Sequence, residues 1–218
     1  MPILALRRDK VRQPLSQCRQ PRGWLGRLTL WSMNRRHSAL TDWGLQQVSI
    51  GAGDTVLDVG CGGGRTVAKL AARATAGRVY GIDIAPESVA VSRRTNRQAI
   101  AAGRVSIDQA SVAALPFAAE TFDLATAVET HFWWQSLGEG MREICRVLKP
   151  GGTLVIIAEF YNGGRHARYA ARLGALTGMA ALDVAQHQAM FAGAGFTGVR
   201  VVEDGRRGWI AAIGTKPA

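Results

Sequence analysis

The pattern best suited to bind a ligand in this chain consists of one acid and three glycines at alternating positions: Asp58, Gly60, Gly62 and Gly64. Strand-forming residues lead into it over 54–59, and a helical spacing of apolar residues begins at Arg65. Glycines between a strand and a helix let the backbone turn sharply and approach a ligand closely, because they carry no Cβ atom. A strand, a glycine loop and a helix in this order predict the opening unit of a nucleotide-binding α/β fold.

The spacing of the glycines separates the nucleotide classes. A dinucleotide-binding loop has the pattern G-x-G-x-x-G, and Arg65 stands where its third glycine would be. No Lys-Ser or Lys-Thr pair follows the loop, which argues against a P-loop. A second strand, expected over 78–83, ends in Asp83. In a βαβ unit an acid at this place lies beside the glycine loop and can accept hydrogen bonds from both ribose hydroxyls.

The sequence D-x-G-x-G-x-G at 58–64 resembles motif I of the class I S-adenosylmethionine-dependent methyltransferases. The segments LPFAAETFD (115–123) and REICRVLKPGGTLVI (142–156) resemble the same family, so the similarity covers about residues 40–215. The small-molecule, methyltransferase-11-like branch fits best, because the signatures of nucleic-acid, protein-arginine and metal-dependent catechol-type methyltransferases are not evident. The resemblance implies an enzyme that binds S-adenosyl-L-methionine, releases S-adenosyl-L-homocysteine and methylates a small-molecule acceptor by in-line transfer.

Strand and helix patterns alternate along most of the chain and predict a Rossmann-like, doubly wound α/β fold. Strands are expected over 54–59, 78–83, 104–109, 122–128 and 152–159, and helices over 65–76, 86–102, 136–148 and 183–194. A hairpin over 197–203 and 208–214 completes a mostly parallel seven-stranded sheet with an antiparallel C-terminal hairpin. We expect a flexible basic N-terminal arm over 1–22 and a single methyltransferase domain over 23–218, with an N-terminal helical cap over 23–48 and a lid-like insertion over 160–182.

An open α/β sheet binds its ligand beyond the carboxyl ends of its strands. The resemblance implies that the cofactor contacts are made there by Asp58, Gly60, Gly62, Gly64, Asp83, Ile84, Ser111, Val112 and Glu129. Ser111 stands where related enzymes usually carry an aspartate that faces the adenine amino group, and this is a departure from the family's pattern. The backbone of Val112 can still read the adenine edge.

The segment after the fourth strand is expected to border the methyl acceptor. His131 lies there beside the aromatic residues 132–134, and is either a general base or a hydrogen-bonded residue of a packed core. A base is needed only where the acceptor must lose a proton, so methylation of oxygen, nitrogen, sulfur or carbon is left open. The residues expected to contact the acceptor are Asn34, His37, Thr130, Trp134 and Tyr161. No metal site is expected.

The chain of 218 residues has a formal net charge of +11, and its N-terminal end is the most basic part. Up to Arg36 there are nine Lys and Arg residues and one acid, Asp9. Such an arm could contact nucleic acid or an anionic membrane surface, or be a solvated extension. The alternatives are therefore an RNA- or membrane-surface-associated methyltransferase and a non-catalytic S-adenosylmethionine-binding protein. Three scattered cysteines, with no visible signal peptide or transmembrane segment, predict a cytoplasmic protein.

Overall fold

The structure of the protein, a computed structural model, describes residues 22, 23, 26, 29, 30 and 35–218. Asn34 and the expected basic arm, apart from Arg22, lie outside the described residues, and the expected cap over 23–48 is described only in part. Among the described residues, no helix is both long and apolar enough to cross a membrane.

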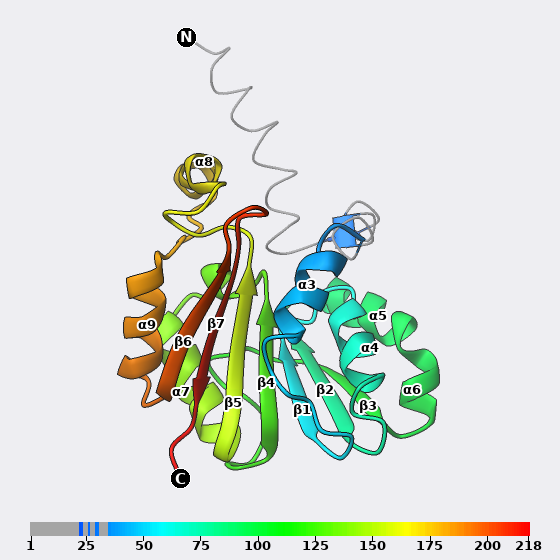
Figure 1. The fold of residues 1–218 in the computed structure, drawn as a ribbon. Helices are drawn as coiled ribbons and strands as arrows, with labels where there is room; N and C mark the ends of the chain where they lie inside the picture. The colour runs from blue at the N-terminus through cyan, green and yellow to red at the C-terminus, as the bar shows by residue number, and fades with distance from the viewer. Residues whose placement is uncertain (1–21, 24–25, 27–28, 31–34) are drawn as a thin grey trace.

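A seven-stranded sheet with the order β3-β2-β1-β4-β5-β7-β6 organises the described part of the chain (Figure 1). Its strands are β1 (Thr55–Val59), β2 (Arg78–Asp83), β3 (Val105–Gln109), β4 (Phe122–Val128), β5 (Leu148–Ala158), β6 (Thr197–Asp204) and β7 (Trp209–Thr215). The first five pair in parallel, and β7 lies antiparallel between β5 and β6. The predicted doubly wound sheet with an antiparallel C-terminal hairpin is thus confirmed. The strand order reverses between β1 and β4, where such sheets bind ligands.

Helices cover both faces of the sheet (Figure 1). They are α3 (Ser38–Leu45), α4 (Arg65–Ala71), α5 (Pro86–Thr95), α6 (Arg97–Ala101), α7 (Leu137–Val147), α8 (Ala167–Thr177) and α9 (Val184–Gly193), with a 3₁₀ turn η1 (His131–Trp133). Side chains of β1 alternate between the two cores: Val56 packs with residues of α3 and α4, whereas Leu57 and Val59 pack with residues of α7 and α9. Strand alternation therefore fixes which helices cover each face.

Three of the expected elements differ from the structure by more than one residue at a boundary. The helix expected over 86–102 is divided at Asn96, whose buried Nδ2 donates to the carbonyl oxygens of Gly64 and Ser92 and so competes with backbone pairing. The helix expected over 65–76 ends at Ala71, whose carbonyl accepts from the Arg104 guanidinium. β5 begins at Leu148 rather than at 152, because Leu148 already pairs with Phe122.

The helix α3 lies directly on β5, and this contact positions residues of the site. A Cβ atom on Gly44 would overlap the side chain of Ile157, so the glycine permits the close approach of helix and strand. Lys69 of α4 ties α3 from the other side, because its ammonium pairs with Asp42 and donates to the Ser38 carbonyl. The N-terminal end of α3 is thereby held at the carboxyl end of β5.

The expected lid-like insertion contains α8, which is the outermost helix in Figure 1. Ala170 is the one buried residue of this helix, and the Tyr169 side chain, whose ring lies beside that of Phe160, is 56% exposed. The segment also carries three arginines, at positions 165, 168 and 172, and all three are exposed. The described side chains of α8 do not line the cavity described below.

Candidate active site

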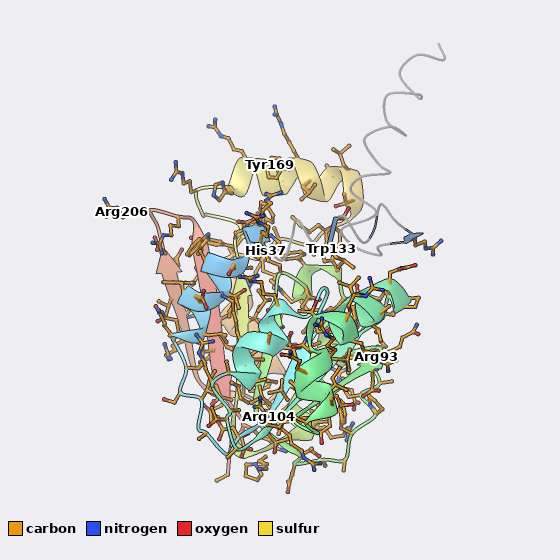
Figure 2. All side chains as sticks on the ribbon, turned by 90° about the vertical axis from the view of Figure 1, so that its right-hand side faces the viewer. His37, Arg93, Arg104, Trp133, Tyr169 and Arg206 are labelled. Carbon is orange, nitrogen blue, oxygen red and sulfur yellow. The ribbon has the colours of Figure 1, made fainter. Side chains whose placement is uncertain are left out.

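A cavity of about 310 Å³ lies at the carboxyl ends of β1, β2 and β4, where the strand order reverses. Its wall includes the glycine loop, the ends of β2 and β4, the turns after β3 and β4, and His37 and Thr41 from the N-terminal end of α3. Figure 2 shows His37 and Trp133 at the same end of the sheet, beneath α8. The cavity is of a size suited to a small ligand.

The three predicted glycines have different tasks. All have positive φ: 72° at Gly60, 49° at Gly62 and 80° at Gly64. A Cβ on Gly60 would overlap Thr130, and a Cβ on Gly64 would overlap Ser92 and come within 2.8 Å of its backbone. At Gly62 the nearest atom would be Leu30 Cδ2 at 3.8 Å, so this backbone faces open space. Gly60 and Gly62 line the cavity, whereas Gly64 supports the packing of α4 against α5 and does not line it.

Asp83 is held at the end of β2 by two backbone groups. Its Oδ2 accepts from the Gly62 N–H at 2.9 Å, and its Oδ1 accepts from the Ala85 N–H at 2.9 Å. Burial raises the pKa of Asp83, and these two hydrogen bonds oppose the rise. The carboxylate lines the cavity with both oxygens oriented, so it can accept further hydrogen bonds from a diol such as a ribose.

Asp58 was expected to contact the cofactor, but it does not line the cavity. It is 1% exposed within β1, where its Oδ1 accepts from Thr126 Oγ1 of β4 at 2.7 Å. Its Oδ2 is buried and has no hydrogen-bond partner among the described residues. Burial raises the pKa of Asp58 to about 7. The structure therefore places Asp58 behind the glycine loop, as a link between β1 and β4.

Ile84, Ser111 and Val112 all line the cavity, beside Asp83. Ile84 is 47% exposed, which is unusual for a large apolar side chain in this protein. The Ser111 Oγ accepts from the Ala113 N–H at 3.2 Å and so shapes its own turn. These residues form a partly apolar wall at the ends of β2 and β3 that suits a flat heterocycle.

The turn after β4 brings Glu129, Thr130 and Trp134 to the cavity. Trp134 Nε1 donates to Thr130 Oγ1 over a long 3.4 Å. A Cβ on Gly140 would lie 3.0 Å from Trp134 Cε3 and 3.2 Å from Val112 Cγ1. Trp134 and Val112 thus share one wall, so the ring expected to contact the acceptor lies on the side where the adenine is expected.

His131, for which the sequence left a general base and a core residue as alternatives, lies outside the cavity. It is 1% exposed, and its Nε2 lies 3.3 Å from Nε2 of His187. Burial, together with the charge of His187, lowers the pKa of His131 to about 3. Both the enclosure and this neutrality favour the alternative, a hydrogen-bonded residue of a packed core.

Tyr161, which was expected to contact the acceptor, also lies away from the cavity. Its side chain is 2% exposed and packs with Phe132, Met179 and Ile210, outside the cavity. Burial and the Glu203 carboxylate raise the pKa of Tyr161 to about 12. The chain turns after β5 so that this ring enters a separate apolar cluster, a turn that residue type and spacing do not reveal.

A cluster of one histidine and two acids, which we call the His37 cluster, forms where α3 meets the ends of β4 and β5. It consists of His37, Glu129 and Glu159, which offer one ligand atom each within 4.8 Å of one another. His37 Nε2 lies 3.6 Å from Glu159 Oε1, and Glu129 Oε1 accepts a short hydrogen bond from the Glu159 N–H. Sequence reasoning missed Glu159, because the strand pattern shows its position but not the histidine opposite.

The electrostatics of the His37 cluster are coupled. Burial lowers the pKa of His37, but the Glu159 and Glu129 carboxylates outweigh it and leave this pKa above its ordinary value. Burial raises the pKa of Glu129 to about 7. The hydrogen bond and charge of His37 hold the pKa of Glu159 below its ordinary value. A protonated His37 is therefore stabilised by Glu159, and His37 is one of the proton-accepting groups on the cavity wall.

Other lining residues also escaped sequence reasoning. Arg65, Thr66 and Glu139 lie on the wall. Arg65 and Thr66 open α4 directly after the glycine loop, so their place at a helix N-terminus was a usable signal. Glu139 lies in the first turn of α7, and the sequence gives no comparable signal for it.

The chain is similar to known methyltransferases in sequence. Residues 57–156 match the methyltransferase domain family. Methyltransferase GfsG of Streptomyces halstedii is 38% identical over 117 residues, which cover 54% of this chain and 42% of that protein. O-methyltransferase cnsE of Penicillium expansum is 36% identical over 110 residues, covering 50% and 40%. The chain thus spans about two fifths of the length of these relatives.

The fold has a close counterpart among solved structures. An S-adenosylmethionine-dependent methyltransferase from Aquifex aeolicus superposes with a TM-score of 0.72 at 21% identity, covering 85% of this chain and 96% of that one. The matched segment 57–156 contains the glycine loop, Asp83 and the turns after β3 and β4, which build most of the cavity. The matched segment, these relatives and the shared fold together support a class I S-adenosylmethionine-dependent methyltransferase family for this chain.

Proposed function

We propose that this protein is an S-adenosylmethionine-dependent methyltransferase that methylates a hydroxyl group of a small-molecule acceptor by in-line transfer. The observation that carries the proposal is the arrangement of Asp83 and Gly62. A carboxylate oriented by two backbone N–H groups lies beside a bare glycine backbone at one cavity. This combination suits a nucleoside whose ribose binds the acid while the chain beyond it passes the glycines.

The residues present fit this cofactor. Asp83 would hold the ribose hydroxyls, and the exposed Ile84 with Val112 would cover the adenine. The space beyond Gly62, which a side chain would fill, leaves room for the methionine part. S-adenosylmethionine supplies a methyl group that is already activated on a sulfonium sulfur. The protein therefore has mainly to position the acceptor and exclude water.

The acceptor side of the proposal rests on the far part of the same cavity. His37, Thr130 and Trp133 line it, and together they offer a polar group, a hydroxyl and an aromatic wall. The cavity volume of about 310 Å³ favours a small molecule over a polymer. Oxygen is the preferred acceptor atom because the relative from Penicillium expansum is named as an O-methyltransferase and because a proton acceptor lies on the wall.

Calorimetry with S-adenosylhomocysteine tests the cofactor part. We expect wild type to bind it and not NAD. Asp83→Ala should weaken binding by roughly 1–3 kcal/mol, the usual loss when a buried polar partner is removed. Gly62→Val should weaken it further, because φ is positive and the side chain enters the ligand space. The matched control is Asp108→Ala, since Asp108 is a half-exposed acid of β3 outside the cavity. Binding of NAD alone would refute the cofactor assignment.

A cofactor-consumption assay tests the acceptor part. Wild type should methylate at least one compound in a panel of small phenols and alcohols, with the product identified by mass spectrometry. Methylation confined to amines or thiols would refute the assignment to oxygen. Cofactor binding without turnover on any small molecule would favour the non-catalytic alternative.

A further inference from the structure

We infer that His37 is the general base that takes the proton from the acceptor hydroxyl, and that Glu159 and Glu129 position its ring and stabilise its protonated form. The inference rests on the proposed function and assigns a role within it. His37 comes from α3, outside the segment that matches the methyltransferase domain family. The presence of a histidine at this position on the cavity wall is thus a feature of this chain's N-terminal region.

The geometry gives the two ring nitrogens different partners. His37 Nε2 lies 3.6 Å from Glu159 Oε1, and the two side chains are 18% and 20% exposed. Because Nε2 faces the carboxylate, Nδ1 is the nitrogen that takes the proton. A base whose second nitrogen is held by a carboxylate keeps one tautomer and one ring orientation. His37 itself lines the cavity, as a base must in order to reach the acceptor.

Glu129 has a backbone conformation that is unfavourable for a residue other than glycine. Its φ is 57°, one of two positive values found at non-glycine residues in the described part of the chain. Such backbone costs of order 1 kcal/mol and tends to persist where it serves a site. Here it turns the carboxyl toward β5, where Oε1 accepts from the Glu159 N–H. This contact fixes the backbone that carries Glu159 opposite His37.

The charge balance of the reaction explains why two acids surround the base. The acceptor O–H bond breaks and its oxygen bonds to the methyl carbon, while the methyl–sulfur bond breaks and the sulfur keeps the electron pair. The proton passes to His37 Nδ1. One positive charge therefore moves from sulfur to the imidazole ring. Carboxylates beside that ring stabilise the charge where it arrives, which is the kind of electrostatic effect that lowers a barrier most.

The titration of His37 depends on four charged or titratable neighbours. Glu159 and Glu129 raise its pKa, and Arg36 lowers it. His166 acts indirectly, because its charge lowers the pKa of Glu159. Since the base must be neutral to accept a proton, kcat/KM for an alcohol should rise with pH through the pKa of His37. Removing the Glu159 charge should move this rise to lower pH.

The decisive experiment compares two acceptors in His37→Gln, Glu159→Gln and wild type. An unionised alcohol needs the base, so His37→Gln should lose roughly 100-fold or more in kcat/KM. With an acidic phenol that is already ionised at the assay pH, the kcat/KM of His37→Gln should fall by less than about 5-fold. Glu159→Gln should shift the pH profile for the alcohol downward. Glu120→Gln serves as the control, because its side chain is exposed and lies outside the cavity.

A second measurement uses the protein without cofactor or acceptor. The His37 ring is titrated by NMR with labelled histidine, and its signal is assigned by its absence in His37→Gln. The midpoint should lie above 6.5 in wild type and fall in Glu159→Gln. An unchanged midpoint in Glu159→Gln would refute the positioning role, whatever the activity of the variants.

The outcomes separate the inference from the proposed function. If wild type methylates no hydroxyl compound, the proposed function fails first. The base assignment is wrong if wild type is active on alcohols and the kcat/KM of His37→Gln falls equally for the alcohol and the phenol. It is also wrong if kcat/KM falls for neither acceptor. Calorimetric binding of Mg²⁺, Mn²⁺ or Zn²⁺ that Glu129→Gln abolishes, together with chelator-sensitive activity, would assign the His37 cluster to a metal and overturn the inference. Retained affinity for S-adenosylhomocysteine shows that each variant is folded.

Discussion

At the scale of single residues, the two histidines inside the protein have definite protonation states. His187 Nδ1 lies 2.7 Å from the Asp183 carbonyl oxygen and therefore donates to it. His187 Nε2 is then an acceptor, so the proton between the rings belongs to His131. Nδ1 of His131 is buried with no partner among the described residues. A proton added to either ring would place an unpaired charge in the core.

This pair should make the protein sensitive to acid. The pKa of His131 is about 3 in the folded protein against an ordinary value of 6.5, so only the unfolded chain binds the proton between these values. The stability is complete above pH 6.5 and decreases as the pH falls. Between pH 6.5 and 5.0 the loss is about 2 kcal/mol for this ring. Urea unfolding at pH 7.5 and 5.0 should show this loss in wild type and a smaller one in His131→Phe.

The comparison of variants is needed because two acids act in the opposite direction. Burial raises the pKa of Asp58 and of Glu129 to about 7, so their penalty in the folded state disappears on acidification. These groups are present in both proteins, and their effect cancels in the difference. The variant His166→Gln, which removes a half-buried histidine that lies against the Arg207 carbonyl oxygen, should keep the wild-type pH dependence. Equal pH dependence in wild type and His131→Phe would contradict the assignment.

The adjacent tryptophans should have separable roles. Trp134 shares a wall with Val112, whereas Trp133 packs edge-on against Phe132 at 5.5 Å between ring centroids. Trp134→Ala should therefore weaken S-adenosylhomocysteine binding at least tenfold, about 1.4 kcal/mol. Trp133→Ala should reduce kcat/KM for the acceptor while leaving that affinity nearly unchanged. Calorimetry measures the affinity of both variants for S-adenosylhomocysteine, and kinetics measures their kcat/KM for the acceptor. If Trp133→Ala weakened the affinity and Trp134→Ala lowered only kcat/KM, the two roles would have to be exchanged.

The sequence predicted the positions of some site residues better than those of others. Asp83 could be placed beside Gly62 because a βαβ unit has nearly fixed geometry from strand to loop. His131 and Tyr161 could not be placed, because whether a residue after a strand faces the cavity or the core depends on the local turn. A 3₁₀ turn at His131–Trp133 directs His131 inward, and nothing in the residue types indicates that turn.

At the scale of elements, the contact of α3 with β5 determines the His37 cluster. The helix carries His37 at its N-cap and Thr41 on the cavity wall, while β5 ends one residue before Glu159. The strands of the sheet were predictable from alternation and apolar runs, which are local properties. The place of α3 was not, because it depends on Gly44 meeting Ile157, a contact between residues far apart in sequence.

Enlarging Gly44 tests this element. In Gly44→Val the new side chain overlaps Ile157, so α3 must move away from β5 at a cost of typically 1–3 kcal/mol. Methylation should fall more than S-adenosylhomocysteine affinity, because His37 moves while Asp83 does not. Ala39→Val is the control, since Ala39 is an exposed residue of the same helix. The double variant Gly44→Val/Ile157→Ala should recover part of both losses. A fully active Gly44→Val would show that the position of α3 does not govern activity.

At the scale of the whole molecule, the cavity joins two parts that are also connected through the sheet and through the contact of Lys69 in α4 with Asp42 in α3. One side of it comes from the glycine loop and the end of β2, packed with α4 and α5, and the other from the turn after β4 and from α3. A ligand that contacts both sides should therefore stabilise the protein as a unit. This coupling follows from the reversal of strand order between β1 and β4, which the alternating sequence pattern did predict.

Thermal unfolding with and without ligand measures that coupling. S-adenosylhomocysteine at 100 times its Kd should stabilise the folded protein by about 2.7 kcal/mol. For a chain of 218 residues this corresponds to a rise in Tm of roughly 5–11 °C, because each kcal/mol moves Tm by about 2–4 °C at this size. Asp83→Ala should show a much smaller rise at the same concentration, and Asp108→Ala the full one. A rise of equal size in wild type and Asp83→Ala would mean that the ligand binds elsewhere on the protein.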